Sequence, residues 1–306
     1  MLAIDKNTIT DVALAQMSST PDPRLKEIIS ALVRHLHAFA REVDLTPEEW
    51  LEGIKFLTAV GQTCTPYRQE FILLSDTLGL SSLINTLHDR RAADPSADSG
   101  TRTSLLGPFY RQDSPPRKLG DSIANRTDGP QICIYGRVLN TAGEGIPGGT
   151  VQIWQTDDNG VYDLQRQDPC LMDLRATFHA DSEGRYYLRT LRPLGYMIPM
   201  DGPVGDMIRA QRRHGYRPAH IHFMIGAPGY RELVTALYLR SDDHIDSDTV
   251  FGVTDSLVTE TVVKDPLSPF QDLPSIHFDF TLAVAHTKGK SGRVGADPSQ
   301  IMKSGH

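Results

Sequence analysis

The sequence predicts an α+β protein in which a helical N-terminal segment precedes an antiparallel β-sandwich. Two observations predict this class. Apolar residues recur at helical spacing up to about residue 92, and short β-prone runs separated by turn residues replace them after about residue 100. We therefore expect a helical domain at residues 1–104, a β-sandwich domain at 105–286 and a disordered tail at 287–306, where the composition leaves almost nothing to bury.

Four helices are expected in the N-terminal domain. The first begins at Asp22-Pro23, and the second begins at Thr46, where Glu49 completes a capping box. A third spans residues 65–79, and a fourth begins at residue 81 or 82. The first helix carries an apolar stripe wide enough to pack against another surface. The stripe consists of Leu25, Ile28, Ile29, Leu32, Val33, Leu36, Phe39 and Val43.

Six strands are expected in the second domain, because short runs rich in β-branched and aromatic residues alternate with turn residues. Their ranges are 131–140, 150–156, 185–192, 219–225, 232–240 and 278–284. Strands of this length and spacing are typical of an antiparallel sandwich or an open barrel.

Composition and charge exclude several classes of function. The chain has 306 residues, 39% of them hydrophobic, with a net charge of -7 and a pI near 5.9. An acidic chain is a poor partner for a polyanion, and its paired arginines, Arg90-Arg91 and Arg212-Arg213, are short and isolated. We expect no binding to nucleic acid.

No segment of the sequence predicts a membrane span or a secretory signal. Polar residues such as Asp5 and Asp11 interrupt the apolar stretches near the start of the chain. The three cysteines, Cys64, Cys133 and Cys170, form no Cys-x-x-Cys pair, so we interpret them as buried or idle thiols. Together these features predict a cytoplasmic protein.

Two histidines, His220 and His222, are separated by one residue on a predicted strand. Successive side chains of a strand point to opposite faces, so these two imidazoles share a face and can converge on one metal ion. The alternative is an ordinary solvated strand. A cupin-type centre is not favoured, because Gly226 and Ala227 stand where it would need a glutamate.

Two tyrosines, Tyr162 and Tyr196, each follow a glycine-containing turn. At such places a side chain can be directed into a site rather than into the core. The alternative for each is a half-buried phenol that is satisfied by a hydrogen bond.

Several segments of the chain together resemble the intradiol ring-cleaving catechol dioxygenases. They occur in the order found in that family and span nearly the whole chain. The segments are Leu106–Tyr110, Gly136–Val138, Pro147–Asp157, Gly160–Asp163, Pro193–Tyr196 with Pro199 and Asp201–Pro203, and Arg217–His222.

The resemblance implies a non-haem ferric ion, one per subunit, held by Tyr162, Tyr196, His220 and His222. It also implies that Arg217 lies beside the bound aromatic ring and stabilises negative charge there, where the alternative role is a structural ion pair. Phenolate ligands suit a hard Lewis acid such as ferric iron. A bound cation also keeps tyrosine deprotonated below its usual pKa near 10.

In the reaction implied by the resemblance, two adjacent hydroxyls of an aromatic diol or triol chelate the iron, and Tyr196 leaves the metal and acts as a base. Dioxygen then opens the ring between the two hydroxylated carbons.

The substrate implied by the resemblance is hydroxyquinol (1,2,4-trihydroxybenzene), which would give 3-hydroxy-cis,cis-muconate and then maleylacetate. A helix at residues 69–79 is similar to the one that covers the family's pocket, with Leu73 and Asp76 one turn apart. Asp76 can accept a hydrogen bond from the third hydroxyl, and residues 246–253 also resemble the hydroxyquinol branch. The alternatives are a solvated or capping Asp76, and a catechol or chlorocatechol 1,2-dioxygenase that yields cis,cis-muconate.

Further residues are expected in the pocket wall, although most of them could equally belong to the core. They are Leu105, Leu106, Gly107, Pro108, Phe109, Ile198, Pro199 and Val250. One departure from the family is Ala236, which follows Val234-Thr235 where catechol-cleaving relatives have a glutamine near the metal. A hydrogen bond to the metal's surroundings is therefore expected to be missing.

The resemblance also implies a homodimer formed through the N-terminal helices, with a phospholipid retained at the dimer interface. The stripe between Leu25 and Val43 is compatible with this arrangement, but it would look the same if it packed within one chain. Two other functions stay open at this stage. One is a non-catalytic, transthyretin-like β-sandwich binding module. The other is a ferrous ring-opening enzyme or zinc hydrolase that combines His220 and His222 with a carboxylate such as Glu232.

Overall fold

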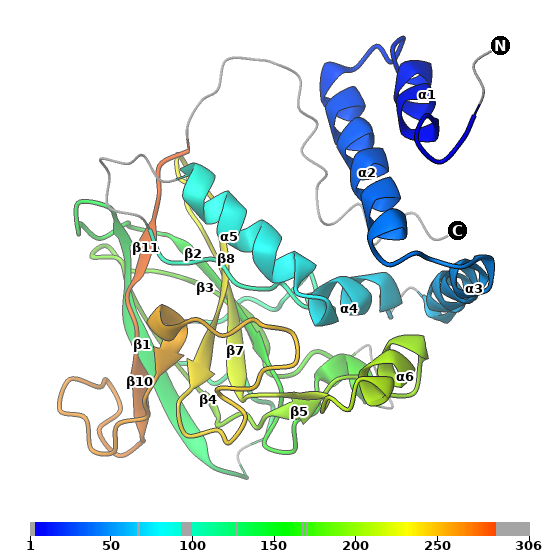
Figure 1. Cartoon of the computed structure of the whole chain (residues 1–306). Helices are drawn as coiled ribbons and strands as arrows, with labels where there is room; N and C mark the ends of the chain where they lie inside the picture. The colour runs from blue at the N-terminus through cyan, green and yellow to red at the C-terminus, as the bar shows by residue number, and fades with distance from the viewer. Residues whose placement is uncertain are drawn as a thin grey trace. The chain divides into compact units, whose positions relative to one another are not determined.

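The computed structural model describes residues 4–65, 68–92, 100–126, 128–166, 168 and 171–285. The predicted tail at 287–306 and Cys170 lie outside these residues. The chain divides into two compact units, residues 1–59 and 60–306. Figure 1 shows the helices and strands of the chain, with a colour that follows the sequence from the N-terminus to the C-terminus.

The first unit contains α1 (Ile9–Gln16), α2 (Pro23–Glu42) and most of α3 (Pro47–Thr63). Helix α1 was not predicted from the sequence. Helix α2 begins at Asp22, whose carboxylate accepts the backbone N–H of Arg24 at 2.8 Å. Helix α3 begins with the predicted capping box between Thr46 and Glu49, whose two hydrogen bonds measure 2.9 and 3.2 Å. Both helix starts are confirmed.

Most of the predicted apolar stripe of α2 is not covered by the described residues. Six of its side chains are each about half exposed, between 47% and 54%. They are Leu25, Ile28, Leu32, Leu36, Phe39 and Val43. A continuous apolar face of this kind indicates a surface that another molecule or segment covers.

The second unit begins with α4 (Glu70–Thr77) and α5 (Leu80–Ala92). The predicted third helix is shorter than expected, because Thr65 forms an isolated bridge with Arg68 before α4 starts at Glu70. A further helix, α6 (Pro203–Ala210), was not predicted. The Glu70 carboxylate accepts the backbone N–H of Val204 at 3.2 Å, which joins α4 to the start of α6. Figure 1 shows these two helices beside each other.

Two larger sheets and a short ribbon form the rest of the second unit. The five-stranded sheet has the order β3 (Arg175–His179), β2 (Thr150–Gln155), β7 (His220–Gly226), β8 (Leu233–Leu239) and β9 (Val258–Thr259). In the other sheet, β1 (Gln131–Asn140) pairs with β4 (Arg185–Leu191), β10 (Ser275–His277) and β11 (Phe280–Leu282). The ribbon is β5 (Tyr196–Met197) with β6 (Tyr216–Arg217).

The α+β class is confirmed, but the sheets are mixed rather than strictly antiparallel. The pairs β1–β4, β2–β7 and β7–β8 are antiparallel, as expected. The pair β2–β3 is antiparallel as well, although β3 was not predicted. The pairs β1–β10, β1–β11 and β8–β9 are parallel. The parallel partners are strands of only two or three residues, and a strand this short can join a sheet edge in either direction once a long connection has brought it there.

The core lies between the sheets and fixes the orientation of β7. Ile221, Phe223 and Ile225 of β7 belong to the buried apolar cluster that also includes residues of β1, β2 and β8. Because side chains alternate along a strand, His220 and His222 point to the other face. The packing of the core therefore presents both imidazoles on the same side. No helix among the described residues is long and apolar enough to cross a membrane.

Candidate metal centre

His220 and His222 are buried side by side on β7. They are 1% and 2% exposed, and their ring centroids are 4.8 Å apart. His220 Nδ1 lies 2.7 Å from the carbonyl oxygen of Pro218. Since a carbonyl can only accept, Nδ1 carries the proton and Nε2 keeps its lone pair. Burial lowers the pKa of both rings well below the usual value, and the Arg217 charge lowers them further. Both imidazoles are thus held in the neutral form that binds metals.

Tyr162 and Tyr196 lie against this histidine pair. The hydroxyl of Tyr162 is 3.3 Å from Nε2 of His220, and the ring centroids of Tyr196 and His220 are 5.7 Å apart. The two phenol rings are 5.5 Å apart and nearly perpendicular. The structure therefore brings together the four side chains that the sequence singled out.

The backbone positions both tyrosines. The Asp157 carboxylate accepts the N–H of Asn159 and of Val161, at 2.8 and 3.0 Å, and so shapes the turn before Tyr162. Gly160 in this turn has a φ of +75°, and a Cβ there would lie 2.8 Å from the carbonyl oxygen of Gly195. A Cβ on Gly195 would in turn lie 2.6 Å from the carbonyl oxygen of Arg217. The segments that carry the two tyrosines and Arg217 touch through backbone atoms at these glycines.

The chemistry of the four donors fits a cation. Burial raises the pKa of Tyr162 well above its usual value, and it also raises that of Tyr196, where the Arg217 charge opposes the effect. A buried phenolate is therefore unfavourable unless a positive charge compensates it. An ion bound between two neutral imidazoles and two phenolates would supply that charge.

The ring of His222 is fixed by its neighbours. Its Nδ1 is buried and makes no hydrogen bond within normal geometry to the described residues, although the Leu105 backbone partly opposes the lowering of the ring's pKa by burial. The ring stacks on Trp154 with centroids 5.0 Å apart and planes 5° apart. Gly107, at a φ of +71°, closes the other side, since its Cβ would lie 3.4 Å from the ring. Packing on two sides fixes the plane in which the imidazole can offer a lone pair.

The alternative of a centre with two histidines and a carboxylate is not supported. Among the described residues, no group of three or more His, Cys, Asp or Glu side chains is placed to hold a metal ion. Glu232 therefore does not complete a site with His220 and His222.

Arg217 is buried beside the donors, with 3% of its surface exposed. Its Nη1 lies 3.2 Å from Nε2 of His220 and 3.5 Å from the hydroxyl of Tyr196. The other edge of the guanidinium faces Asp248, with Nε 3.2 Å from Oδ1. The positive charge thus points at the place where the four donors meet.

Some of the predicted wall residues contact the donors directly. Phe109 stacks on Tyr162 with ring centroids 4.3 Å apart and meets the edge of Tyr196 at 6.3 Å. Asp76 of α4 is 5% exposed. Burial raises the pKa of Asp76, whereas a hydrogen bond with Ser81 and the charge of Arg217 lower it. The charge of Asp76 in turn raises the pKa of Tyr196. Asp76 is therefore within electrostatic reach of the site.

The other wall residues differ in burial. Leu73, Leu105, Ile198 and Val250 are buried, and Leu106, Pro108 and Pro199 are half-buried. Their place in a substrate pocket stays a prediction. Ala236 lies opposite His222 in the β7–β8 pair, so its small side chain does stand next to this ligand candidate.

Three residues that surround the donors were not predicted from the sequence. Asp248 and Tyr238 both contact Arg217, and Trp154 supports His222. A signal was present for Asp248 alone, because it belongs to the segment 246–253, but nothing local indicated its partner 31 residues away.

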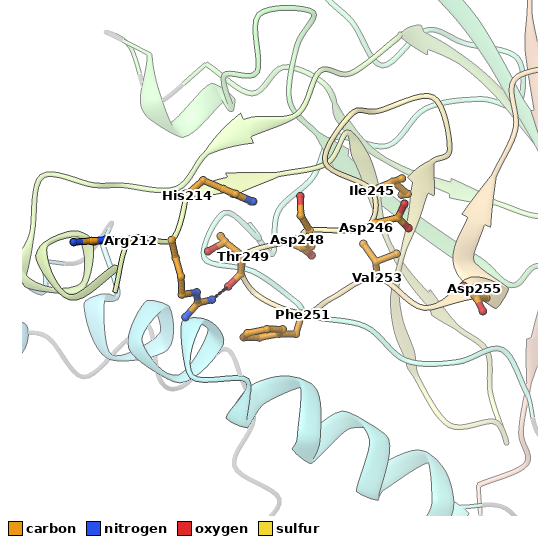
Figure 2. A pocket seen from close by; sticks show the side chains of 11 residues that line it. Arg212, His214, Ile245, Asp246, Asp248, Thr249, Phe251, Val253 and Asp255 are labelled. Carbon is orange, nitrogen blue, oxygen red and sulfur yellow. Dashed lines mark hydrogen bonds between the residues drawn. The ribbon is translucent and has the colours of Figure 1, made fainter. Parts of the chain in front are cut away.

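A pocket of about 490 Å³ opens beside Asp248. Figure 2 shows its lining, which comes from the loop after α6, including Arg212 and His214, and from the chain between Ile245 and Asp255. Asp248 therefore lines this pocket and also forms an ion pair with the buried Arg217.

Comparisons with known proteins give consistent results. The family described as dioxygenase matches residues 105–284, and the one described as catechol dioxygenase N terminus matches residues 22–95. The 6-chlorohydroxyquinol 1,2-dioxygenase of Cupriavidus pinatubonensis is 43% identical and covers 86% of this chain and 93% of that protein. The hydroxyquinol 1,2-dioxygenase of Rhodococcus opacus is 42% identical and covers 86% of both. The crystal structure of hydroxyquinol 1,2-dioxygenase from Pseudomonas putida DLL-E4 has a TM-score of 0.83 and 43% identity, and covers 92% of this chain and 99% of that one.

Proposed function

Since this chain belongs to the family of intradiol ring-cleaving dioxygenases, we propose that it cleaves hydroxyquinol with dioxygen between its two adjacent hydroxylated carbons. Both oxygen atoms enter the product, 3-hydroxy-cis,cis-muconate, which tautomerises to maleylacetate. The observation that carries the proposal is the gathering of two phenols and two neutral imidazoles beside a buried arginine. The names of the relatives, which refer to hydroxyquinol and 6-chlorohydroxyquinol, support the choice of substrate.

Tyr162, Tyr196, His220 and His222 are the proposed ligands of one ferric ion per subunit. When bound, this ion supplies a Lewis acid that draws electron density from a catecholate and makes the ring reactive towards dioxygen. The protein's part is to keep the imidazoles neutral and to place the phenols where their deprotonation is compensated.

Tyr196 is the proposed base for the substrate's hydroxyl proton. Its hydroxyl lies 3.5 Å from Nη1 of Arg217, and the charge of this arginine favours the phenolate against the effect of burial. Once protonated, Tyr196 is neutral in a buried site, which its environment favours. The hydroxyl of Tyr162 lies 3.3 Å from Nε2 of His220 instead, and Tyr162 is the tyrosine that stays with the metal in the proposal.

Arg217 stabilises the negative charge that develops on the ring. It is buried, preoriented and does not need to move when the reaction begins, which are the properties that make a charge effective in catalysis. Phe109 covers Tyr162 and excludes water from that side.

Asp76 is the proposed determinant for the third hydroxyl of hydroxyquinol. A buried carboxylate on α4 accepts a hydrogen bond well but is costly to leave unpaired. A substrate without that hydroxyl leaves Asp76 with the Ser81 hydrogen bond but with a remaining acceptor position unfilled, so the site favours the triol over catechol.

We also propose an assembly, based on membership of the family. The half-exposed stripe of α2 supports a homodimer through the N-terminal helices, with a phospholipid at the interface. The proposed location is the cytoplasm. The division of the chain at residue 104/105 into a helical domain and a catalytic domain is supported by the two matched ranges, 22–95 and 105–284.

The test is oxygen uptake by the iron-loaded protein with hydroxyquinol and with catechol, together with identification of the products. We expect faster uptake with hydroxyquinol, a maleylacetate product and a visible absorption band from tyrosinate bound to ferric iron. Faster uptake with catechol would move the assignment to catechol 1,2-dioxygenase. A protein that stays colourless and inactive after iron loading would contradict the enzyme assignment and favour a binding module.

A further inference from the structure

We propose that Asp248 is the positioning residue that holds the guanidinium of Arg217 against the donor side chains. This inference rests on the proposed function, because it assigns to Asp248 the task of keeping a catalytic charge in place. Within the part of the chain that the structure describes, Asp248 pairs with Arg217 and forms no hydrogen bond or ion pair with the four proposed metal ligands, so it acts through Arg217.

The guanidinium of Arg217 makes two sets of contacts, one with Asp248 and one with the donor side chains. Its Nε and Nη2 lie 3.2 and 3.4 Å from the two carboxylate oxygens of Asp248, and Nη2 also lies 3.4 Å from the hydroxyl of Tyr238. Its remaining nitrogen, Nη1, is the one that reaches Tyr196 and His220. A planar fork held at two nitrogens has little freedom left at the third. The Asp248 contacts therefore determine where Nη1 points.

The Asp248 carboxylate is itself fixed by the turn that follows it. Oδ1 accepts the backbone N–H of Val250 at 3.2 Å, and Oδ2 accepts that of Gly252 at 3.0 Å. Between them, Phe251 has a φ of +57°, a conformation that a bulky residue adopts only when its surroundings impose it. We call residues 248–252 the Asp248 turn.

The turn fits closely around the arginine. A Cβ on Gly252 would lie 2.5 Å from the hydroxyl of Tyr238 and 3.1 Å from Nη2 of Arg217. The Tyr238 hydroxyl also lies 2.9 Å from Oγ of Ser104, which donates to the carbonyl of Gly252 at 3.3 Å. The absence of a side chain at residue 252 is what lets the turn approach.

The turn is also tied to the helices that precede the sheets. Ser82 of α5 donates to the carbonyl of Phe251 at 2.8 Å. Arg213 donates to the carbonyls of Thr249 and Thr77, at 2.7 and 2.9 Å. Since Thr77 is the last residue of α4, the turn that holds Arg217 is anchored to the helix that carries Asp76.

Charge gives Asp248 its role. Arg217 is 3% exposed, so its positive charge would be poorly tolerated there without a counter-charge. Asp248 is 7% exposed and provides that charge at contact distance. A buried cation that loses its partner relaxes towards solvent or another acceptor. The pocket beside Asp248 provides solvent towards which the Arg217 guanidinium would then move.

The experiment compares Asp248→Asn with Asp246→Asn, an exposed carboxylate in the same segment and pocket that serves as a matched control. For the iron-loaded proteins, we expect Asp248→Asn to keep its iron and to lower kcat by about 10- to 100-fold with a much smaller change in KM, as for other residues that orient a functional group. The control should change kcat by less than about twofold.

A double-mutant cycle separates positioning from a general structural role. In an Arg217→Ala background, Asp248→Asn should have almost no further effect on kcat. The same fold-loss in both backgrounds, or no loss in the wild-type background, would overturn the proposal. The same cycle is repeated for the free energy of unfolding, measured with urea on the metal-free proteins. We expect this free energy to show coupling between Arg217 and Asp248, and strictly additive effects would count against the proposal.

A second variant covers the case in which Asp248→Asn does not fold. Tyr238→Phe keeps the ion pair and removes one contact with Arg217, so a loss of roughly threefold to tenfold in kcat is expected. An unchanged kcat in Tyr238→Phe would then overturn the proposal. Failure of the proposed function would look different, because the wild-type protein would not consume oxygen, while the unfolding cycle would still report the Arg217–Asp248 contact.

Discussion

Replacement of Asp76 by alanine tests how the site distinguishes a triol from a diol. The carboxylate lies on α4, is 5% exposed and is close enough to Arg217 and Asp248 for their charges to act on its pKa. Asp76→Ala should therefore lower kcat/KM for hydroxyquinol more than for catechol, because only hydroxyquinol offers the hydroxyl that this carboxylate would accept.

The expected size follows from the type of interaction. A hydrogen bond to a charged group contributes about 1.5–3 kcal/mol, and each 1.36 kcal/mol is a factor of ten in rate. The ratio of the two kcat/KM values should thus fall by roughly 10- to 150-fold. Losses common to both substrates, such as repacking of α4, cancel in this ratio.

The assay is oxygen uptake at low concentrations of each substrate, with iron content measured for every preparation. Asp206→Ala is the control, because its carboxylate lies on the exposed side of α6 and pairs with Arg209 at 2.5 Å. Equal losses for the two substrates in Asp76→Ala would refute the assignment of Asp76 to the third hydroxyl, even if the absolute rates fell.

Three further results are expected. Tyr162→Phe should reduce the iron content, whereas Tyr186→Phe, a buried tyrosine that donates to the carbonyl of Phe278, should retain it; normal iron in Tyr162→Phe would exclude that ligand. In the metal-free protein, Asp76→Asn should raise the Tm at pH 7 but not near pH 4. The folded protein raises the pKa of Asp76 above 3.8, so stability from its protonated form is present below that pH and is lost as the pH rises through the folded pKa; a pH-independent gain would contradict this. Gly107→Ala should lower the Tm, because a φ of +71° costs an alanine about 1–2 kcal/mol, and an unchanged Tm would show that this turn relaxes freely.

Much of the fold could be predicted because the deciding information is local. The strand at 131–140 and the capping box at Thr46 appear where the pattern placed them. The short strands β5 and β6 and the helix α6 were missed, since two-residue strands have no periodicity and α6 depends on Glu70, 134 residues away. Elements of this kind exist because of tertiary contacts, which a local pattern does not record.

The same limit applies to the site. His220 and His222 could be placed on one face from strand periodicity alone, and the structure has them there. Their approach to Tyr162 depends on backbone contacts between distant glycines, and only the resemblance to a family indicated it. The role of the four residues as iron ligands remains a proposal. Asp248 could not have been paired with Arg217 from sequence, because neither residue lies in a pattern that specifies the other.

The backbone contacts at Gly160 and Gly195 have a consequence for which substitutions the site tolerates. A Cβ at residue 160 would lie 2.8 Å from the carbonyl oxygen of Gly195, and one at residue 195 would lie 2.6 Å from that of Arg217, so an alanine at either position would have to push two chain segments apart. Because these segments carry Tyr162, Tyr196 and Arg217, one added methyl group should displace several of these side chains together.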